Sequence, residues 1–358
     1  MYLREAWYVA AWGHEISETP LARVLLEEPV VLWRTQDGAP VAFEDRCCHR
    51  QAPLSVGRVL GDTLQCGYHG LTFDADGMCV DVPSQAQVPP GAQVRAYPLV
   101  ERNDWVWIWM GDPAAADETL IPDTYWHDSP DWKAVGDRFL VNCHYQSLID
   151  IQLDNTHSRF VHPDTLGNDG SLRHSPKTTR DGDVLRNHRR MRDSDPPPIF
   201  ARASGINGNA DVWVEWAYTP RAGIITFDAG VAELGSGVFE GNRDRAWTMF
   251  NTHGITPETA TTCHHFWVSA RDFSLDDDEI HRTMAGIREV FLEDVAMVEA
   301  QQRILDYGSD TPQVDISADV PTIQARRLVD RLIGESSGGP IKARRVTGPV
   351  SLAALFGR

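Results

Sequence analysis

Residues 47–70 read CCHRQAPLSVGRVLGDTLQCGYHG and contain two short pairs of metal-binding side chains. Cys47 and His49 form a C-x-H pair, and Cys66 and His69 form a C-x-x-H pair after sixteen intervening residues. Two thiolates and two imidazoles can hold one tetrahedral zinc ion. They can equally hold a two-iron, two-sulfur cluster in which two histidines replace two cysteines on one iron.

The grouping of the ligands favours the two-iron cluster. Zinc fingers usually keep like ligands together, whereas each loop here offers one thiolate and one imidazole. This suits two loops that clamp a cluster, with the cysteines on one iron and the histidines on the other. The ligand order, the spacing and the following Gly70 resemble the Rieske signature. We therefore predict a Rieske [2Fe–2S] cluster, with zinc as the alternative, held by Cys47, His49, Cys66 and His69.

Length and composition narrow the class of protein. A chain of 358 residues exceeds one ordinary core, so two domains are expected. A formal charge of −18 without any lysine/arginine run argues against nucleic acid and anionic membranes as partners. We find no signal-peptide pattern and no apolar run of transmembrane length, and expect a cytoplasmic location. The cysteines outside the two pairs are expected to be small buried residues: Cys48, Cys79, Cys143 and Cys263.

The first 115 residues read as an all-β domain. Val30–Arg34 is rich in strand-forming residues, and Asp37-Gly38 is a hairpin signal after it. In Trp105–Trp109 the tryptophans alternate, so they share one face of a strand. Both ligand pairs fall beside turns, where short loops on a rigid sheet can converge on a metal.

A second domain is predicted over residues 116–335, after a proline-rich crossing at 111–130. It combines several strands with helices at 145–157 and 274–305, so the fold class is α+β. The long loops 163–176 and 193–198 are typical of lids or substrate-contacting segments. A C-terminal tail, 336–358, is expected to be poorly ordered.

The second domain contains a weaker set of metal-binding side chains. Asp154 and His157 share a helix face, but His157 and His162 stand about 140° apart on an ideal helix. They could bind one ion only if the helix ends or distorts between them.

The late helix strengthens this prediction. Asp294 falls within its apolar stripe, whereas Glu293 is expected to point away. A carboxylate that faces a core needs a compensating partner, either a metal or an arginine. Two histidines and one carboxylate form the facial triad of non-haem Fe(II) oxygenases, and we assign His157, His162 and Asp294 to it. The stripe consists of Ile280, Met284, Ile287, Phe291, Val295 and Val298.

With both sets in view, the chain resembles the oxygenase (α) component of Rieske non-haem iron oxygenases. The phrases RCCHRQAPLS, CGYHGLTFDADG, ERNDWVWIWMGDP, FVHPDTLG and ITPETATT are similar to those of the group that includes vanillate O-demethylase, dicamba O-demethylase and toluenesulfonate methyl-monooxygenase. The resemblance implies a Rieske domain followed by a helix-grip domain, and a head-to-tail homotrimer. It further implies that Asp154 bridges His69 of one chain to His157 of the next. The sequence departs from the family where Ile151 replaces an asparagine near the iron.

The resemblance also implies the reaction. Electrons from NAD(P)H would reach the cluster through a reductase with flavin and a plant-type [2Fe–2S] centre, and O₂ would be the co-substrate at the mononuclear Fe(II). We expect O-demethylation of a methoxylated aromatic acid. Hydroxylation of an aryl methyl group or of the ring is the alternative, and a Rieske electron carrier without oxygenase activity a distant one. Substrate contacts are expected among Asn251, His253, His265, Arg189 and Arg202.

Overall fold

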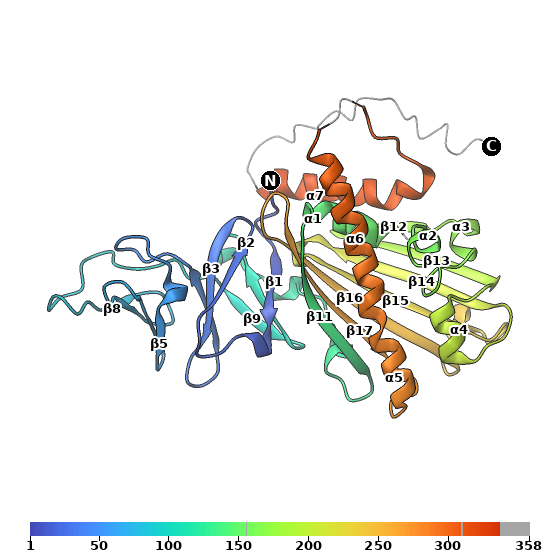
Figure 1. Ribbon diagram of the computed structural model, residues 1–358, viewed down its shortest axis with the longest axis horizontal. Coiled ribbons are helices and arrows are strands. Elements are labelled where there is room, and N and C mark those ends of the chain that lie inside the picture. The colour runs from blue at the N-terminus through green and yellow to red at the C-terminus, as the bar shows by residue number, and fades with distance from the viewer. Residues whose placement is uncertain (155, 309–310, 337–358) are drawn as a thin grey trace.

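The computed structural model describes residues 1–154, 156–308 and 311–336. Three small β-sheets form the N-terminal part, and a seven-stranded antiparallel sheet with helices forms the C-terminal part. Figure 1 shows the two parts side by side along the long axis of the molecule. The predicted α+β class is therefore confirmed. The domain boundary at residues 115 and 116 stays a prediction.

The N-terminal part has its own hydrophobic core, separate from that of the large sheet. Trp33, Phe43 and Phe73 fill it, together with the buried Cys47 and Cys66. One sheet has the order β2-β3-β4, and the other has the order β5-β6-β7-β8. The strands are β2 (Leu21–Leu25), β3 (Glu28–Arg34), β4 (Pro40–Glu44), β5 (Arg58–Leu60), β6 (Thr63–Gln65), β7 (Thr72–Phe73) and β8 (Cys79–Asp81).

A third sheet joins the two parts. It has the order β1 (Trp7–Trp12), β10 (Trp105–Trp109) and β9 (Leu99–Arg102). The three tryptophans of β10 pack in one cluster with Ile224, Phe266 and Val268 of the large sheet, which confirms their predicted common face. Val106 and Ile108 point the other way, into the largest core. Because both faces of β10 are covered, this strand couples the packing of the two domains.

The large sheet has the order β11-β17-β16-β15-β14-β13-β12, and all neighbouring strands are antiparallel. We call the side that carries Trp216, Met249 and Trp267 the inner face, because these residues share a core with the helices. The outer face meets the β1-β10-β9 sheet. The strands are β11 (Lys133–Val141), β12 (Lys177–Asp181), β13 (Val184–Ser194), β14 (Ala210–Thr219), β15 (Ile224–Ala232), β16 (Ala246–Pro257) and β17 (Cys263–Arg271).

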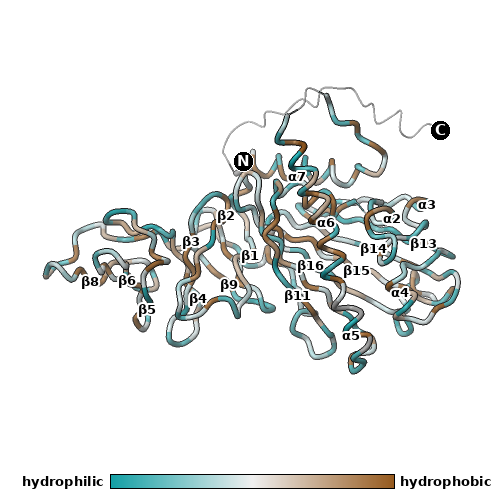
Figure 2. Tube along the Cα trace, viewed as in Figure 1, coloured by the Kyte–Doolittle hydropathy of each residue, from teal (hydrophilic) through white to brown (hydrophobic). Residues whose placement is uncertain are grey.

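Helices cover the inner face, with α6 crossing the sheet and α1 and α7 beside it (Figure 1). Figure 2 shows hydrophobic stretches where the helices meet the sheet and hydrophilic ones along the outer loops. Among the described residues, none of the helices combines the length and the apolar composition that a membrane crossing requires. The helices are α1 (Tyr145–Leu153), α2 (Ser158–Val161), α3 (Gly170–Arg173), α4 (Pro198–Ser204), α5 (Asp278–Ala285), α6 (Ile287–Leu305) and α7 (Val320–Ser336).

Several predicted elements differ from the observed ones. The helix predicted at 145–157 ends at Leu153, and Asp154 adopts an extended conformation. The helix predicted at 274–305 begins only at Asp278 and is divided at Gly286, a residue type that destabilises a helix interior. The predicted loops contain α3 and the start of α4, and α7 was not predicted. The predicted tail lies outside the described residues except for Ser336.

The free cysteines follow the prediction with one exception. Cys79, Cys143 and Cys263 are buried, as expected for small apolar side chains. Cys48 is exposed, because it lies between the two ligands of the first loop, whose backbone turns at the surface.

Candidate metal centres

The first candidate centre lies between two loops of the N-terminal part. The loop with Cys47 and His49 follows β4, and the loop with Cys66 and His69 connects β6 to β7. Both cysteines are buried and both histidines are exposed. The two imidazole rings lie 4.5 Å apart between their centroids. The chain therefore offers two inner sulfurs and two outer nitrogens, as a cluster with one iron near the surface requires.

Local backbone contacts shape both loops. The Gln51 N–H donates to the Cys47 carbonyl at 2.9 Å, and the Gly70 N–H donates to the Cys66 carbonyl at 3.1 Å. Gly70 has a φ of +78°, which a residue with a side chain adopts only under strain. The tight turn after His69 therefore depends on glycine.

The chemistry of the four side chains fits a two-iron cluster better than one zinc ion. Burial and the neighbouring Cys66 sulfur raise the pKa of the Cys47 thiol to about 12, so a bound metal would have to displace its proton. Among the described residues, the donor atoms that gather around one point belong to His157, His162 and Asp294. The N-terminal four do not gather in that way, which agrees with ligands divided between two irons.

The second candidate centre combines three separate elements. His157 lies just before α2, His162 lies just after it, and Asp294 lies on α6. Asp294 Oδ1 is 2.8 Å from His162 Nε2 and 3.3 Å from His157 Nε2. One donor atom from each residue lies within 4.8 Å of the others. Helix α2 occupies the residues between the two histidines and ends at Val161, so His162 leaves the helical path, which was the predicted condition for both to reach one ion.

Electrostatic interactions explain how the carboxylate of Asp294 can be buried in this core. Asp294 is 4% exposed. Burial would raise its pKa, but the hydrogen bonds from His157 and His162 outweigh burial and lower the pKa. Burial would lower the pKa of His162, yet its bonds to Asp294 and Glu293 raise it. No arginine among the described residues pairs with Asp294, so the alternative compensation by arginine is wrong. Two imidazoles and one carboxylate fit a non-haem iron with open positions.

Two further polar contacts hold the triad. The His162 Nδ1–H donates to Glu293 Oε2 at 2.7 Å. Glu293 points away from the apolar stripe and is exposed, as predicted, but its contact with His162 was not predicted. The His162 ring thus contacts two successive carboxylates of α6, Glu293 through Nδ1 and Asp294 through Nε2. The Gln152 amide donates to Asp294 Oδ2 at 3.1 Å. The sequence analysis missed both residues. Two features of the sequence could have indicated them. Glu293 directly precedes the carboxylate of Asp294, and Gln152 is a polar residue among the apolar residues of α1.

Asp154 is placed beside His157. Its carbonyl oxygen accepts a hydrogen bond from His157 Nδ1–H, which orients the ring. Its carboxylate accepts from the backbone and hydroxyl of Thr156 and lies 4.0 Å from His157 Nδ1. Partners of this kind on the second ring nitrogen are common in metal-binding histidines.

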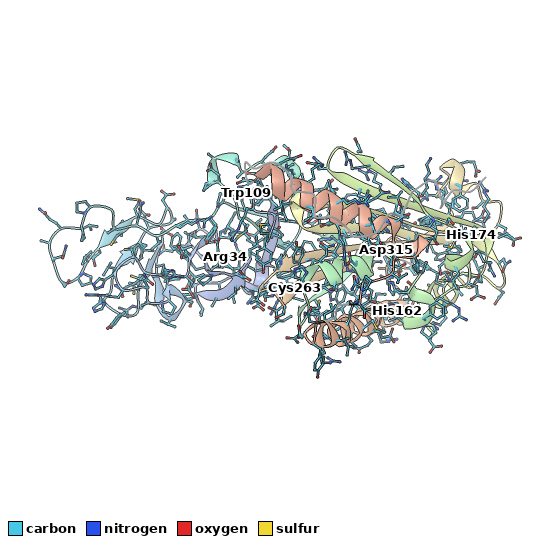
Figure 3. The ribbon with its side chains drawn as sticks, turned by 90° about the horizontal axis from the view of Figure 1, so that it is seen from above. Arg34, Trp109, His162, His174, Cys263 and Asp315 are labelled. Carbon is cyan, nitrogen blue, oxygen red and sulfur yellow. The ribbon has the colours of Figure 1, made fainter. Side chains whose placement is uncertain are left out.

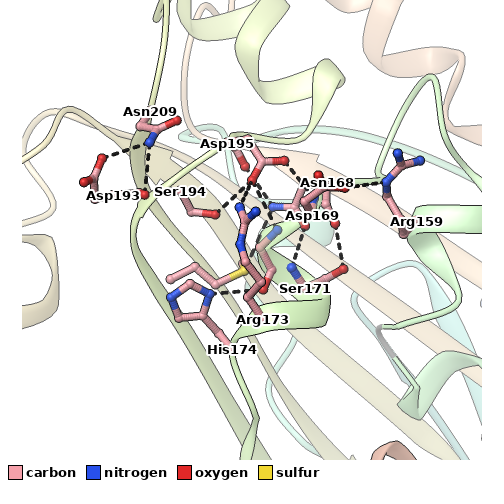
Figure 4. A network of polar contacts seen from close by, with 12 residues as sticks. Arg159, Asn168, Asp169, Ser171, Arg173, His174, Asp193, Ser194, Asp195 and Asn209 are labelled. Atoms are coloured by element: carbon pink, nitrogen blue, oxygen red, sulfur yellow. Dashed lines mark hydrogen bonds and ion pairs between the residues drawn. The ribbon is translucent and has the colours of Figure 1, made fainter.

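A polar network attaches the α2 region to the sheet (Figure 4). Arg159 lies on α2, between His157 and His162, and its guanidinium donates to Asp169 at 2.6 Å. Asp195, just after β13, accepts from the Asp169 N–H at 2.7 Å and from Arg173 at 2.9 Å. The loop after His162 is therefore held against the end of β13. Figure 3 shows His162 in the C-terminal part, with Arg34 toward the other end of the molecule.

The predicted substrate-contacting residues divide into two groups. Asn251, His253 and His265 lie on strands of the inner face. His253 Nδ1 and His265 Nε2 are 2.9 Å apart, and both rings contact Phe291 on α6. Burial lowers the pKa of His265 to about 4, and it lowers the pKa of His253 well below its usual range, so both rings are neutral near pH 7. In the second group, Arg202 is exposed on α4, and Arg189 is buried in β13.

A triad of one half-buried histidine, one buried histidine and a buried carboxylate on a helix-covered sheet, joined to a domain with paired Cys/His loops, defines a Rieske-type non-haem iron oxygenase. Residues 6–98 match the Rieske [2Fe-2S] domain, and residues 141–335 match the vanillate O-demethylase oxygenase C-terminal domain. The chain belongs to this family of oxygenase components. It uses a Rieske cluster and a mononuclear non-haem iron.

Similar proteins cover nearly the whole chain. The iron-sulfur subunit of the toluene-4-sulfonate monooxygenase system of Comamonas testosteroni is 42% identical, over 95% of this chain and 99% of that protein. The vanillate O-demethylase oxygenase subunit of a Pseudomonas species is 33% identical, over 93% and 95%. The crystal structure of dicamba monooxygenase bound to 3,6-dichlorosalicylic acid has a TM-score of 0.86 and 32% identity, over 94% of this chain and 99% of that chain.

Proposed function

We propose that this oxygenase component removes the methyl group of a methoxylated aromatic acid, using O₂ and electrons from NAD(P)H. The observation that carries the proposal is the triad on α6 and either side of α2, inside the segment that matches the vanillate O-demethylase oxygenase domain. The named relatives that act on vanillate and dicamba are O-demethylases. Their likeness supports the same bond and the same class of substrate for this chain.

The ligand assignment is part of this proposal. Cys47, His49, Cys66 and His69 hold the cluster, and His157, His162 and Asp294 hold the iron. The buried sulfurs, the adjacent histidine rings and the gathered donor atoms of the triad support this assignment. Bound iron supplies O₂ activation and oxidation of the C–H bond of the substrate.

The protein contributes ligand orientation and substrate placement. Glu293 holds His162 in one orientation by accepting its Nδ1 proton, and Gln152 holds the far oxygen of Asp294. The inner face surrounds the site with neutral imidazoles and aromatic rings, which exclude water from the reacting carbon. A methoxy group oxidised at its carbon gives a hemiacetal, which breaks down to a phenol and formaldehyde.

Electron transfer is proposed to run between subunits of a homotrimer. The cluster loops lie near β5–β8 at one end of the molecule, whereas α2 lies beyond the large sheet (Figure 1). This separation favours transfer from the cluster of one subunit to the iron of its neighbour. Asp154, which is 24% exposed beside His157, is the proposed bridge to His69 of the neighbour. A separate reductase with flavin and a plant-type [2Fe–2S] centre would supply the electrons.

Hydroxylation of an aryl methyl group is the second candidate. It is favoured by the 42% identity to a subunit of the toluene-4-sulfonate monooxygenase system, which exceeds the identity to the vanillate and dicamba enzymes. Both reactions attack a methyl carbon on an anionic aromatic compound. The position of the substrate decides between them.

Product analysis tests the proposal. The purified chain is supplied with a reductase, NADH and a panel of methoxy- and methyl-substituted benzoates and benzenesulfonates. Formaldehyde in a one-to-one ratio with NADH consumed supports O-demethylation. Benzyl alcohols without formaldehyde support the second candidate, and a cis-diol would contradict both.

A further inference from the structure

Arg189 occupies an unusual position on β13. The side chains of this strand alternate, so that Asn187, Arg189 and Met191 face the helices. Arg186 and Arg190 face the opposite side and are exposed. Arg189 is 3% exposed, although arginine is rarely buried without a partner.

Within the described part of the chain, the guanidinium of Arg189 forms no ion pair, and Asp154 is the one carboxylate that acts on its charge. Among the described residues, its Nε and Nη1 atoms have no hydrogen-bond acceptor, and no ion pair involves it. The other arginines of the strand differ, because Arg190 pairs with Glu215 and Arg192 pairs with Glu240. Burial lowers the pKa of Arg189, and the carboxylate of Asp154 opposes this shift. A buried and unpaired cation is costly to the folded chain, which suggests that an anion from outside completes the pair.

Unpartnered polar atoms continue around Arg189. Asn187 Oδ1 and Trp216 Nε1 are buried without hydrogen-bond partners within the described chain. These two residues are direct cross-strand neighbours, and Asn187 lies two positions from Arg189 on the same face. Buried polar groups are nearly always paired, so a patch of unpaired ones indicates a place for a ligand.

The other polar groups of the inner face do not supply the same positive charge. His253 and His265 are neutral near pH 7 and are bonded to each other. The buried Arg271 donates through Nη2 to the Ser274 carbonyl at 3.0 Å. Arg271 also has an unpartnered Nε, but its guanidinium already donates to a backbone carbonyl, whereas among the described residues Arg189 lies on the strand face that carries the unpartnered Asn187 beside Trp216.

We propose that Arg189 binds the anionic group of the aromatic substrate, a carboxylate or a sulfonate. This inference rests on the proposed function for the site and names the feature that selects its substrates. The planar guanidinium suits oxygen anions of this shape. Its proximity to Asp154, three residues before His157, places the anion on the same side of the sheet as the triad. A neutral aromatic compound would leave the guanidinium unpaired and be bound more weakly.

Binding measurements test the inference separately from turnover. Calorimetry on the full chain, loaded with both metal centres, compares 4-methoxybenzoate with its neutral counterpart 4-methoxybenzamide, and 4-methylbenzenesulfonate with 4-methylbenzenesulfonamide. The affinity of Arg189→Met for both anions should be lower by about 30-fold or more, as expected when one member of a buried charge pair is removed. The amides should change by less than about threefold. Arg189→Lys keeps the charge but not the planar shape. Its affinity for the two anions should lie between those of the wild type and Arg189→Met.

Arg186→Met is the matched control, because Arg186 is on the same strand but on the exposed face. It should leave every binding constant unchanged. The urea midpoint of ligand-free protein provides a second readout. The urea midpoint of Arg189→Met should equal or exceed that of the wild type, since an unpaired buried charge is removed. Added 4-methoxybenzoate should raise the midpoint of the wild type and not that of the variant.

Three outcomes would overturn the inference: equal losses for acids and amides, a ligand-free Arg189→Met protein with a lowered midpoint, or wild-type protein that binds neither anion. The proposed function fails in a different way. If the anions bind through Arg189 but no methoxy or methyl group is oxidised in the product assay, only the proposed reaction is wrong.

Discussion

Glu293 and Gln152 each hold one member of the iron-binding triad from outside it. Glu293 binds the second nitrogen of His162, and Gln152 binds the second oxygen of Asp294. Such contacts set the orientation and the basicity of metal ligands. Gln152 immediately follows Ile151, where the family pattern has an asparagine. Gln152 thus places an amide beside the carboxylate of Asp294.

Replacing Glu293 by glutamine should weaken iron binding. His162 would lose its carboxylate partner, and the affinity for Fe(II) should fall about 10- to 100-fold while the Rieske spectrum stays unchanged. Competition with a chelator measures this affinity. Glu289→Gln, one turn earlier on the exposed side of α6, is the control and should have no effect. Equal iron affinities in the two variants would contradict a role for Glu293.

Replacing Gln152 by leucine should also weaken iron binding, because Asp294 Oδ2 would be buried without its donor. A loss of about 10-fold or more in Fe(II) affinity is expected by the same chelator assay. Gln146→Leu is the matched control on α1, since Gln146 binds Asp150 and not the triad. An iron affinity unchanged from wild type in Gln152→Leu would show that Asp294 needs no donor there.

At the scale of elements, α6 has both a structural and a chemical role. Its buried residues Ile287, Phe291, Val295 and Val298 pack on the inner face, and the same register turns Asp294 inward. The Phe291 ring contacts the rings of His253 and Trp267 at centroid distances of 4.9 and 5.0 Å. The position of the carboxylate ligand thus depends on the packing one turn before it.

Phe291→Ala should therefore reduce both stability and iron binding. Loss of a buried phenylalanine costs about 3–5 kcal/mol of unfolding free energy, because a cavity remains. Urea denaturation measures this cost, and iron content per chain measures the effect on the site. Met297→Ala is the control on α6, since Met297 is 50% exposed, and a change within about 0.5 kcal/mol is expected. A loss no larger than that of the control would mean that α6 is held by other contacts.

At the scale of the whole molecule, the β1-β10-β9 sheet fixes the N-terminal domain against the outer face of the large sheet. The three tryptophans of β10 form this contact. The cluster loops and the triad are consequently held apart within one chain (Figure 1). A rigid separation of this kind favours an assembly in which each iron receives electrons from another subunit.

Mixed assemblies test this arrangement. His69→Ala removes a cluster ligand, and Asp294→Asn removes an iron ligand, so each variant alone should be inactive. When the two variants are co-expressed and mixed trimers are isolated through both tags, each trimer has one intact iron next to an intact cluster, so about a third of the wild-type rate per chain is expected. Product formation measures the rate. Mixed assemblies as inactive as either parent would show that electrons stay within one chain.

Much of the site could be read from residue types and spacing. The two Cys/His pairs predicted the cluster loops, because thiolates and imidazoles at short spacing usually bind a metal. Asp294 was found because a carboxylate inside an apolar helical stripe requires a partner. The helix end between His157 and His162 was foreseen only as a condition, and the end of α1 at Leu153 was not foreseen, since local sequence does not show where tertiary packing ends a helix.

The sequence by itself determined the ligand types, the β-rich N-terminal half, the α+β class and the register of Asp294, because these follow from chemistry and periodicity within short segments. Only the tertiary structure decided that Glu293 and Gln152 support the triad and that Arg189 is buried with no ion pair to any described residue. These features join residues far apart in the chain. Whether a charge is paired depends on which strands and helices pack together, and spacing along the sequence does not contain that information.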